Sequence, residues 1–300
     1  MEIGKNKKFI EKIKNRVSNT LKLEPVFYNT NLELMAISYL KQQTYLDFKK
    51  IKIILQKNFN NKMPFGYVLK NKMDKIVGFV GTLFSLRNYN NNFIFCNIHT
   101  WIIDKSHRYN SYLPLLPLIK KNYSITAFTP ISSLAGLLEK FGFQKLRMNY
   151  RIIFLLNFLR QKKFIIETND KIIKKLLKGN DLKIYKDYQN ISCIKFLIID
   201  RSKKLENIFV IGSKSRKKIF NVLNLLYVSN NERLKKIWPY FSVLIFKKYN
   251  VLFCGQYFLT EKDVSLPNKI LISKIIKTEI CMKNLPSNFK FDTLYSELIR

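Results

Sequence analysis

Histidine chemistry in this chain can come from only two residues, His99 and His107. An imidazole titrates near neutral pH and can take a proton from a reacting group, so each is a candidate general base. Residues 93–104 are dense in β-branched and aromatic side chains, which predicts a strand that carries His99. His99 is therefore a candidate base, and a buried histidine hydrogen-bonded to a neighbour fits the same position. His107 is expected in the solvated loop that comes next.

Cysteine and glycine usage excludes several classes of site. The four cysteines, Cys96, Cys193, Cys254 and Cys281, lie far apart, and no Cys/His pair has the spacing of metal ligands. We therefore expect no metal, no zinc-finger array and no disulfide scaffold, but reduced, buried thiols in a cytoplasmic protein. Only nine glycines are present, and they form no Walker loop, dinucleotide-binding loop or Gly-x-Ser-x-Gly motif.

The charge of the chain is strongly positive, with 54 Lys and Arg against 20 Asp and Glu, a formal net charge of +34. Such a charge favours a polyanionic partner such as nucleic acid. Only 10 of the basic residues are arginine, whose fork pairs bidentately with bases and phosphates. Because the lysines are spread along the whole chain, solvated helix faces and strand edges are the favoured explanation, and nucleic acid is a possible but not the favoured partner.

Hydrophobic periodicity divides the first half into helices, three antiparallel strands, and then alternating helices and strands. Thr129 followed by Pro130 predicts a helix start, as N-cap and first helical residue. Polar residues 88–92 predict a hairpin loop. Expected helices cover 5–22, 33–40, 45–59, 113–121 (broken) and 131–140, and expected strands cover 66–70, 76–86, 93–104, 123–128 and 143–158.

The second half repeats this order, which predicts domains over residues 1–157 and 158–300. A helix is expected to open at Thr168 and to close at Gly179. Ser229 and Glu232 have capping-box spacing for a helix that ends at Trp238. Expected strands cover 192–199, 207–212, 218–228, 241–246 and 251–259. The longest uncharged apolar stretches are well short of the roughly 20 residues a membrane span needs, and the basic N-terminus lacks the apolar core of a signal peptide.

Three segments carry a family resemblance. They read FGYVLKNKMDKIVGFVGTLFSLR, NIHTWIIDKSHRYNSYL and FTPISSLAGLLEKFGFQKL. Their order and spacing resemble the GNAT superfamily of acetyl-CoA-dependent N-acyltransferases over roughly residues 30–155. The resemblance implies an α+β fold, a mixed and mainly antiparallel sheet flanked by helices. The second half is then expected to be a degenerate second GNAT-like domain.

The resemblance also implies a site for acetyl-CoA. The backbone of Trp101, Ile102, Ile103 and Asp104 is expected to hold the thioester. A loop is expected to hold the pyrophosphate on backbone N–H groups. That loop aligns as Arg108, Tyr109, Asn110, Ser111, Tyr112 and Leu113, in which Ser111 and Leu113 replace the two glycines of the family.

The catalytic positions depart from the family pattern. Leu138 and Ile131 stand where the family often has a tyrosine acid and an asparagine. His99 is then the candidate base. Tyr109, Tyr112 or Tyr123 could substitute as the acid, and Tyr123 is the one we name. The second-half equivalent of the loop, residues 228–233, lacks glycine and carries a carboxylate, so we expect no cofactor there.

Two functions are consistent with this sequence. The first is transfer of an acetyl or longer acyl group from CoA to a small-molecule or peptide amine. The second is a catalytically inactive binding protein of the same fold for a polyanion or nucleic acid. Binding to a polyanion should weaken steeply as salt rises, and CoA binding should not.

Overall fold

The computed structural model describes the chain in several stretches, and its residues group into two compact units. The described residues are 21–44, 46–48, 52, 55, 62–89, 91–128, 130–155, 163–202, 206–217, 220–267, 273–287 and 289–296. Unit 1 comprises Met1–Leu146, Glu279–Phe289 and Tyr295–Glu297, and unit 2 comprises Arg147–Thr278, Lys290–Leu294 and Leu298–Arg300. Residues 5–20 of the helix predicted over 5–22, and most of the helix predicted over 45–59, lie outside the described residues. The predicted end of the first helix is wrong, because Lys22 begins a strand.

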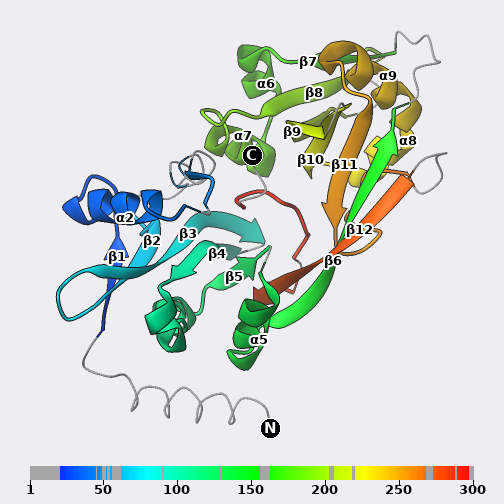
Figure 1. Cartoon of the computed structure of the whole chain (residues 1–300). Coiled ribbons are helices and arrows are strands. Elements are labelled where there is room, and N and C mark those ends of the chain that lie inside the picture. Colours follow the sequence, from blue (N-terminus) through cyan, green and yellow to red (C-terminus); the bar gives the residue numbers. More distant parts are fainter. Residues whose placement is uncertain are drawn as a thin grey trace. The chain divides into compact units, whose positions relative to one another are not determined.

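The sheet of unit 1 has the strand order β1-β2-β3-β4-β5-β12. These strands are β1 (Lys22–Val26), β2 (Gly66–Lys70), β3 (Ile76–Tyr89), β4 (Asn91–Ile103), β5 (Ser124–Ala127) and the end of β12 (Ser273–Lys283) (Figure 1). The pairing of β4 with β5 is parallel and the other pairings are antiparallel. The predicted loop over 88–92 is wrong, because β3 and β4 stay paired as far as Tyr89 and Asn91.

Helices cover both faces of this sheet because neighbouring side chains on a strand point to opposite faces. Phe79 packs in the cluster of α2 (Asn31–Lys41), and Val80 packs in that of α4 (Leu116–Lys120) and α5 (Ser132–Lys140). The chain between β4 and α4 forms two 3-10 helices, η1 (Lys105–Asn110) and η2 (Leu113–Leu115). The second of these and α4 form the broken helix predicted over 113–121, and Pro117 lies in the first turn of α4.

The start of α5 differs from the prediction. Its N-cap is Ile131, which makes no side-chain capping bond, so the helix begins two residues beyond the expected start at Pro130. Thr129 lies outside the described residues. The end is as predicted, because Phe141 is the C-cap and Gly142 comes next with a left-handed φ of 79°.

The sheet of unit 2 repeats the topology, with the order β6-β11-β10-β9-β8-β7. Its strands are β7 (Phe164–Glu167), β8 (Ile194–Asp200), β9 (Ile208–Lys217), β10 (Phe220–Val228), β11 (Phe253–Phe258) and β6 (Gln144–Phe154), which lies mostly in this unit. The fourth and fifth strands, β10 and β11, are again the parallel pair. In each unit one strand comes from a different part of the chain than the rest. In unit 1 this strand is β12, which follows the elements of unit 2 in the sequence. In unit 2 it is β6, which directly follows the elements of unit 1.

Three predictions in unit 2 are wrong. Gly179 opens a second helix instead of closing the first, so α6 (Asp170–Leu176) and α7 (Gly179–Asp187) replace one long helix. The cap of α8 (Asn231–Lys236) is Asn230, whose side chain accepts from the N–H of Arg233, and Ser229 bonds Phe209 instead.

The third correction concerns residues 241–246, which are helical. They belong to α9 (Trp238–Tyr249), where Pro239 occupies the first turn. A short apolar run has the same composition in a buried strand and in a buried helix, and here Phe241 and Ile245 share one helix face in the core with Trp238.

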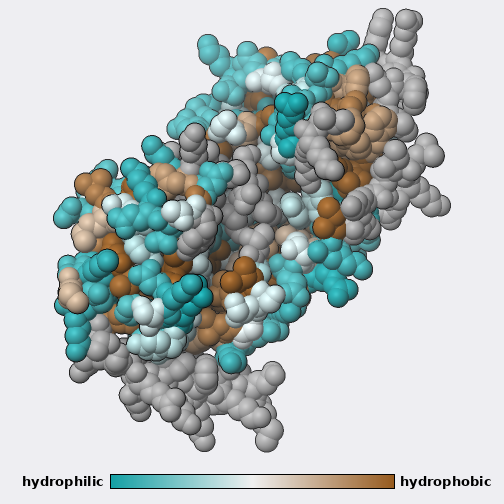
Figure 2. All heavy atoms as spheres, viewed as in Figure 1, coloured by the Kyte–Doolittle hydropathy of each residue, from teal (hydrophilic) through white to brown (hydrophobic). Residues whose placement is uncertain are grey.

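The observed architecture confirms the predicted fold class, an α+β arrangement of a mixed, mainly antiparallel sheet flanked by helices. Hydrophilic residues cover much of the face seen in Figure 2, with separate hydrophobic areas between them. Within the described part of the chain, no helix is both long enough and apolar enough to span a membrane.

Candidate functional site

A bulge in β4 marks the candidate site. Gly81 of β3 pairs with His99 and Val80 pairs with Trp101, so Thr100 is an extra residue in β4. Thr100 has a φ of 48°, in the left-handed region that β-branched residues rarely adopt. Such strain persists where the surrounding structure holds it, and it is frequent at functional sites.

The bulge lies beyond the point where β4 and β5 separate. Their parallel pairing runs from Phe95 and Ser124 to Asn97 and Thr126. β4 then continues for six more residues, to Ile103, while β5 ends at Ala127. Backbone N–H groups in such a stretch have no partner in β5 and can bind a carbonyl oxygen or a developing oxyanion. The structure thus brings Thr100, Trp101 and Ile103 to one unpaired strand end. The prediction for Asp104 is wrong, because its N–H donates to the Val77 carbonyl of β3 over 2.9 Å.

His99 supports the bulge from inside the core. Its side chain is buried, and Nδ1 lies 2.8 Å from the Thr100 hydroxyl oxygen. The ring packs against Gly81, where an added Cβ would lie 2.3 Å from the nearest ring atom. Burial lowers the pKa of His99 to about 4, so the imidazole is neutral at pH 7. A neutral imidazole accepts a proton, but the low pKa makes it a weak base.

The segment predicted to hold pyrophosphate folds without a long helix. The N–H groups of His107 and Ser111 donate to carbonyls three residues earlier. Leu113 is buried, and Arg108 and Tyr109 are exposed. These two backbone donors are thus committed within the 3-10 turns and do not face a ligand.

Asn110, a predicted member of this loop, is buried. Its side chain is 4% exposed, and Nδ2 has no hydrogen-bond partner within the described structure. A buried amide donor without a partner is costly and is typical of a position that a ligand or water completes.

A tyrosine that the sequence did not point to lies at the end of β4. The hydroxyl of Tyr39, from α2, donates to the Asp104 carboxylate over 2.8 Å. Asp104 makes no side-chain capping bond to η1, and only its backbone carbonyl accepts from His107. No sequence pattern links two residues 65 positions apart, and only the packing of α2 on β4 brings them together.

The remaining predicted site residues lie elsewhere in the unit. Tyr123 precedes β5, at the opposite end of that strand from the separation, and packs edge-on against Phe84. Tyr112 stacks on Phe141. Leu138 is fully buried and Ile131 is exposed. The structure therefore does not bring Tyr123 to the unpaired end of β4.

In unit 2, residues 228–233 correspond to the predicted pyrophosphate loop. Their side chains contact other residues of the unit. Asn230 caps α8, and the side chain of Asn231 donates to the Asp263 carbonyl over 2.8 Å. Arg233 contacts Glu206. That this segment binds no cofactor remains a prediction. In the described part of the chain, no group of three or more His, Cys, Asp or Glu side chains is placed to hold a metal ion.

Comparisons with known proteins support this topology. No family model and no curated protein sequence matches the chain. A GCN5-related N-acetyltransferase from Anabaena variabilis ATCC 29413 superposes with a TM-score of 0.57 at 11% identity, covering 87% of this chain and 72% of that one. One from Kribbella flavida gives 0.56 at 8% identity, with coverages of 87% and 70%.

A third similar structure is a GCN5-related glucosamine N-acetyltransferase region of a fungal multi-domain GH3 β-N-acetylglucosaminidase. Its TM-score is 0.55 at 11% identity, covering 89% of this chain and 38% of that one. The strand order, the separation of β4 from β5 and these similarities show that this chain has the GNAT fold.

Proposed function

We propose that unit 1 is an N-acyltransferase that moves an acetyl or longer acyl group from CoA to an amine. The observation that carries the proposal is the bulged end of β4, which runs six residues past its pairing with β5. The acceptor is a small molecule or a peptide with a free amino group. The similar structures agree with this proposal because they have the same fold, and fold alone does not fix activity.

In the proposed reaction, the backbone N–H groups of Trp101 and Ile103 polarise the thioester carbonyl and stabilise the tetrahedral oxyanion. The amine nitrogen attacks the carbonyl carbon, the C–N bond forms and the C–S bond breaks. The attacking amine loses one proton to a base, and the thiolate that leaves gains one. His99 is the candidate base and, because it bonds Thr100, it also positions the bulge.

The residues present fit a CoA substrate in part. Arg108 and Lys105 are exposed cations next to the bulged strand, suited to a pyrophosphate, and Asn110 offers a buried amide donor. Ser111 and Leu113 stand where the family's glycines let the phosphates approach the backbone. We therefore expect weaker cofactor binding than a glycine-rich loop gives, with a larger share from the arginine.

Calorimetric titration with acetyl-CoA tests the proposal. We expect micromolar binding that Arg108→Ala weakens about tenfold, the effect of losing one charge-assisted contact. Arg216→Ala, which removes an exposed arginine of β9, is the matched control and should bind as the wild type does. No binding at millimolar acetyl-CoA would overturn the proposal.

The alternative function, binding of a polyanion, is favoured by one observation. Helix α6 and the nearby chain expose four lysines, Lys171, Lys174, Lys175 and Lys178. Binding of a single-stranded oligonucleotide that weakens steeply between about 50 and 200 mM salt would support this function. Together with absent CoA binding, that result would replace the acyltransferase proposal.

A further inference from the structure

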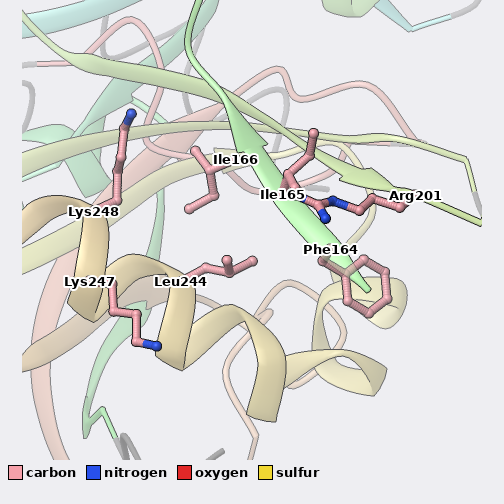
Figure 3. A pocket seen from close by; sticks show the side chains of 7 residues that line it. All are labelled: Phe164, Ile165, Ile166, Arg201, Leu244, Lys247 and Lys248. Carbon is pink, nitrogen blue, oxygen red and sulfur yellow. The ribbon is translucent and has the colours of Figure 1, made fainter. Parts of the chain in front are cut away.

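Unit 2 contains a pocket that the proposed acyl-transfer site does not use. It has a volume of about 380 Å³ and lies between β7 and the C-terminal half of α9 (Figure 3). Its walls come from Phe164, Ile165 and Ile166 of β7 and from Leu244 of α9. This volume is within the range of pockets that hold small ligands.

Three basic side chains, those of Arg201, Lys247 and Lys248, also line the pocket beside the apolar residues. In Figure 3, Ile166 and Leu244 point toward one another, Lys247 and Lys248 lie on one side, and Arg201 lies on the other. All three cations are exposed. None of the residues that line the pocket is acidic.

The nearest negative groups in the sequence are already engaged. The Asp200 carboxylate, next to Arg201, accepts from the N–H and the hydroxyl of Ser202. The Glu167 carboxylate, at the end of β7, accepts from the N–H of Asn169.

The partial negative charge at the end of α9 is also covered, because the Tyr249 carbonyl accepts from the Lys214 ammonium over 3.0 Å. Neither the Asp200 carboxylate nor the Glu167 carboxylate lines the pocket, so an anion brought by a ligand would complement its three cations.

We propose that this pocket binds an amphiphile with one alkyl chain and an acidic headgroup. The alkyl chain would lie against Phe164, Ile166 and Leu244. The headgroup, a carboxylate or a phosphate, would meet Arg201, Lys247 and Lys248. A nucleic acid fits these residues less well, because the apolar walls would face phosphates. The proposal concerns unit 2 alone and does not depend on acyl transfer in unit 1.

Calorimetric titration with decanoate, below its micelle concentration, tests the proposal. We expect a dissociation constant in the micromolar range. Octanoate, two methylenes shorter, should bind about tenfold more weakly, because each buried methylene adds a fixed increment. Decanol lacks the charge and should also bind at least tenfold more weakly. Comparison of decanoate with decyl phosphate tells which acidic headgroup is preferred.

Variants separate the walls from the cations. Leu244→Gln and the double variant Lys247→Ala/Lys248→Ala should each weaken decanoate binding at least tenfold. The matched controls are Leu34→Gln, at an exposed leucine of α2, and Lys174→Ala/Lys175→Ala on α6, which should leave it unchanged. The midpoint of thermal unfolding shows that each variant is folded. Arg108→Ala should also leave decanoate binding unchanged, which separates this test from that of the proposed function.

Two results would overturn the proposal. One is no heat of binding for decanoate or decyl phosphate at millimolar concentration. The other is any sign that the three cations of the pocket do not recognise the anion, whether as equal affinity for decanol and decanoate or as equal weakening by the α6 double variant.

Discussion

The fourth strands of the two units, β4 and β10, are built alike up to a bulge. In each, one extra residue interrupts the pairing with the preceding strand, Thr100 in β4 and Leu226 in β10. In each, a glycine of the preceding strand pairs with the residue just before the bulge, Gly81 in unit 1 and Gly212 in unit 2. The bulge is therefore a property of the topology that both units share.

The units differ in how far other segments cover the bulge. In unit 2 the Leu226 carbonyl accepts from the backbone N–H of Thr293 over 3.3 Å, and Leu226 is buried. The segment after β11 folds back on that strand, since the N–H of Ser265 donates to Gln256 over 2.7 Å and Ser265 is fully buried. In unit 1, Thr100 and Trp101 remain half-exposed.

The same bulge can therefore contact a ligand only where segments later in the chain leave it uncovered. The residue before the bulge also differs. It is the titratable His99 in unit 1 and the apolar Leu225 in unit 2. This contrast supports the proposal that ligand chemistry belongs to the bulge of unit 1 and not to its counterpart.

The largest expected effect comes from filling the space beside the bulge of β4. Gly81→Leu places side-chain atoms where the His99 ring lies, so the ring or the strand must move. We expect the free energy of unfolding to fall by about 3 kcal/mol or more, and CoA binding to be lost. Urea denaturation and calorimetry measure the two effects.

Gly136→Ala in α5, where a Cβ meets nothing within 4 Å, is the control and should be neutral or slightly stabilising. A stable Gly81→Leu variant with unchanged CoA binding would show that the bulge is not the site.

A second prediction uses the histidine that stands before the bulge in unit 1. The unfolded chain protonates His99 below its ordinary pKa of 6.5, whereas the folded chain protonates it only below about 4. The unfolded state thus binds more protons in this window, so stability falls as the pH falls through it. The contribution to the free energy of unfolding that is lost by pH 4 is about 3 kcal/mol.

Urea unfolding at pH 7.5 and pH 4.5 measures this dependence. The His99→Gln variant should lose most of the pH-dependent difference that the wild type shows. The His107→Gln variant removes the other imidazole and should keep it. An unchanged pH dependence in His99→Gln would mean that the ring is not held neutral in the folded protein.

The third prediction concerns residues 260–267 of unit 2, which follow β11 of the parallel pair. Arg151 is buried, and its guanidinium contacts Glu261 over 2.6 Å and the Leu266 carbonyl over 3.2 Å. Arg151→Met keeps the apolar part of the side chain and removes these bonds, at an expected cost of about 2 kcal/mol.

Hydrogen exchange should then be faster in residues 260–267. Arg233→Met, which removes a pair with the exposed Glu206 carboxylate, should cost less than about 1 kcal/mol and is the control. Equal effects of the two changes would show that Arg151 does not hold this segment.

The sequence predicts most strands of both units, because runs dense in β-branched and aromatic residues, such as those of β4 and β8, favour strands. The sequence-based prediction fails where the same residue type or run is compatible with two kinds of secondary structure. Gly179 has a left-handed φ of 54° that suits a helix end, yet it begins α7. Residues 241–246 have an apolar run that fits a strand, and only packing beside Pro239 decides for helix.

The candidate site could be predicted only as a segment. The resemblance leads to residues 99–113, but the left-handed Thr100 and the bond from Tyr39 to Asp104 depend on tertiary packing that no local pattern encodes. Burial of His99 likewise comes from the strand beside it, where Gly81 leaves room for the ring.

The smallest expected effect tests whether the bulge of β10 is held by the end of the chain. Thr293 is buried, and its hydroxyl lies 3.5 Å from the Leu226 carbonyl that its N–H also contacts. Thr293→Val keeps the shape and the N–H but removes the hydroxyl, so the free energy of unfolding should fall by about 1 kcal/mol or less. Urea denaturation measures this change. Thr293→Pro also removes the N–H, so amide exchange around residues 225–228 should be faster in it than in Thr293→Val. If neither variant changes exchange there, the Thr293 contacts do not hold the bulge of unit 2, and the contrast with unit 1 rests on the segment after β11 alone.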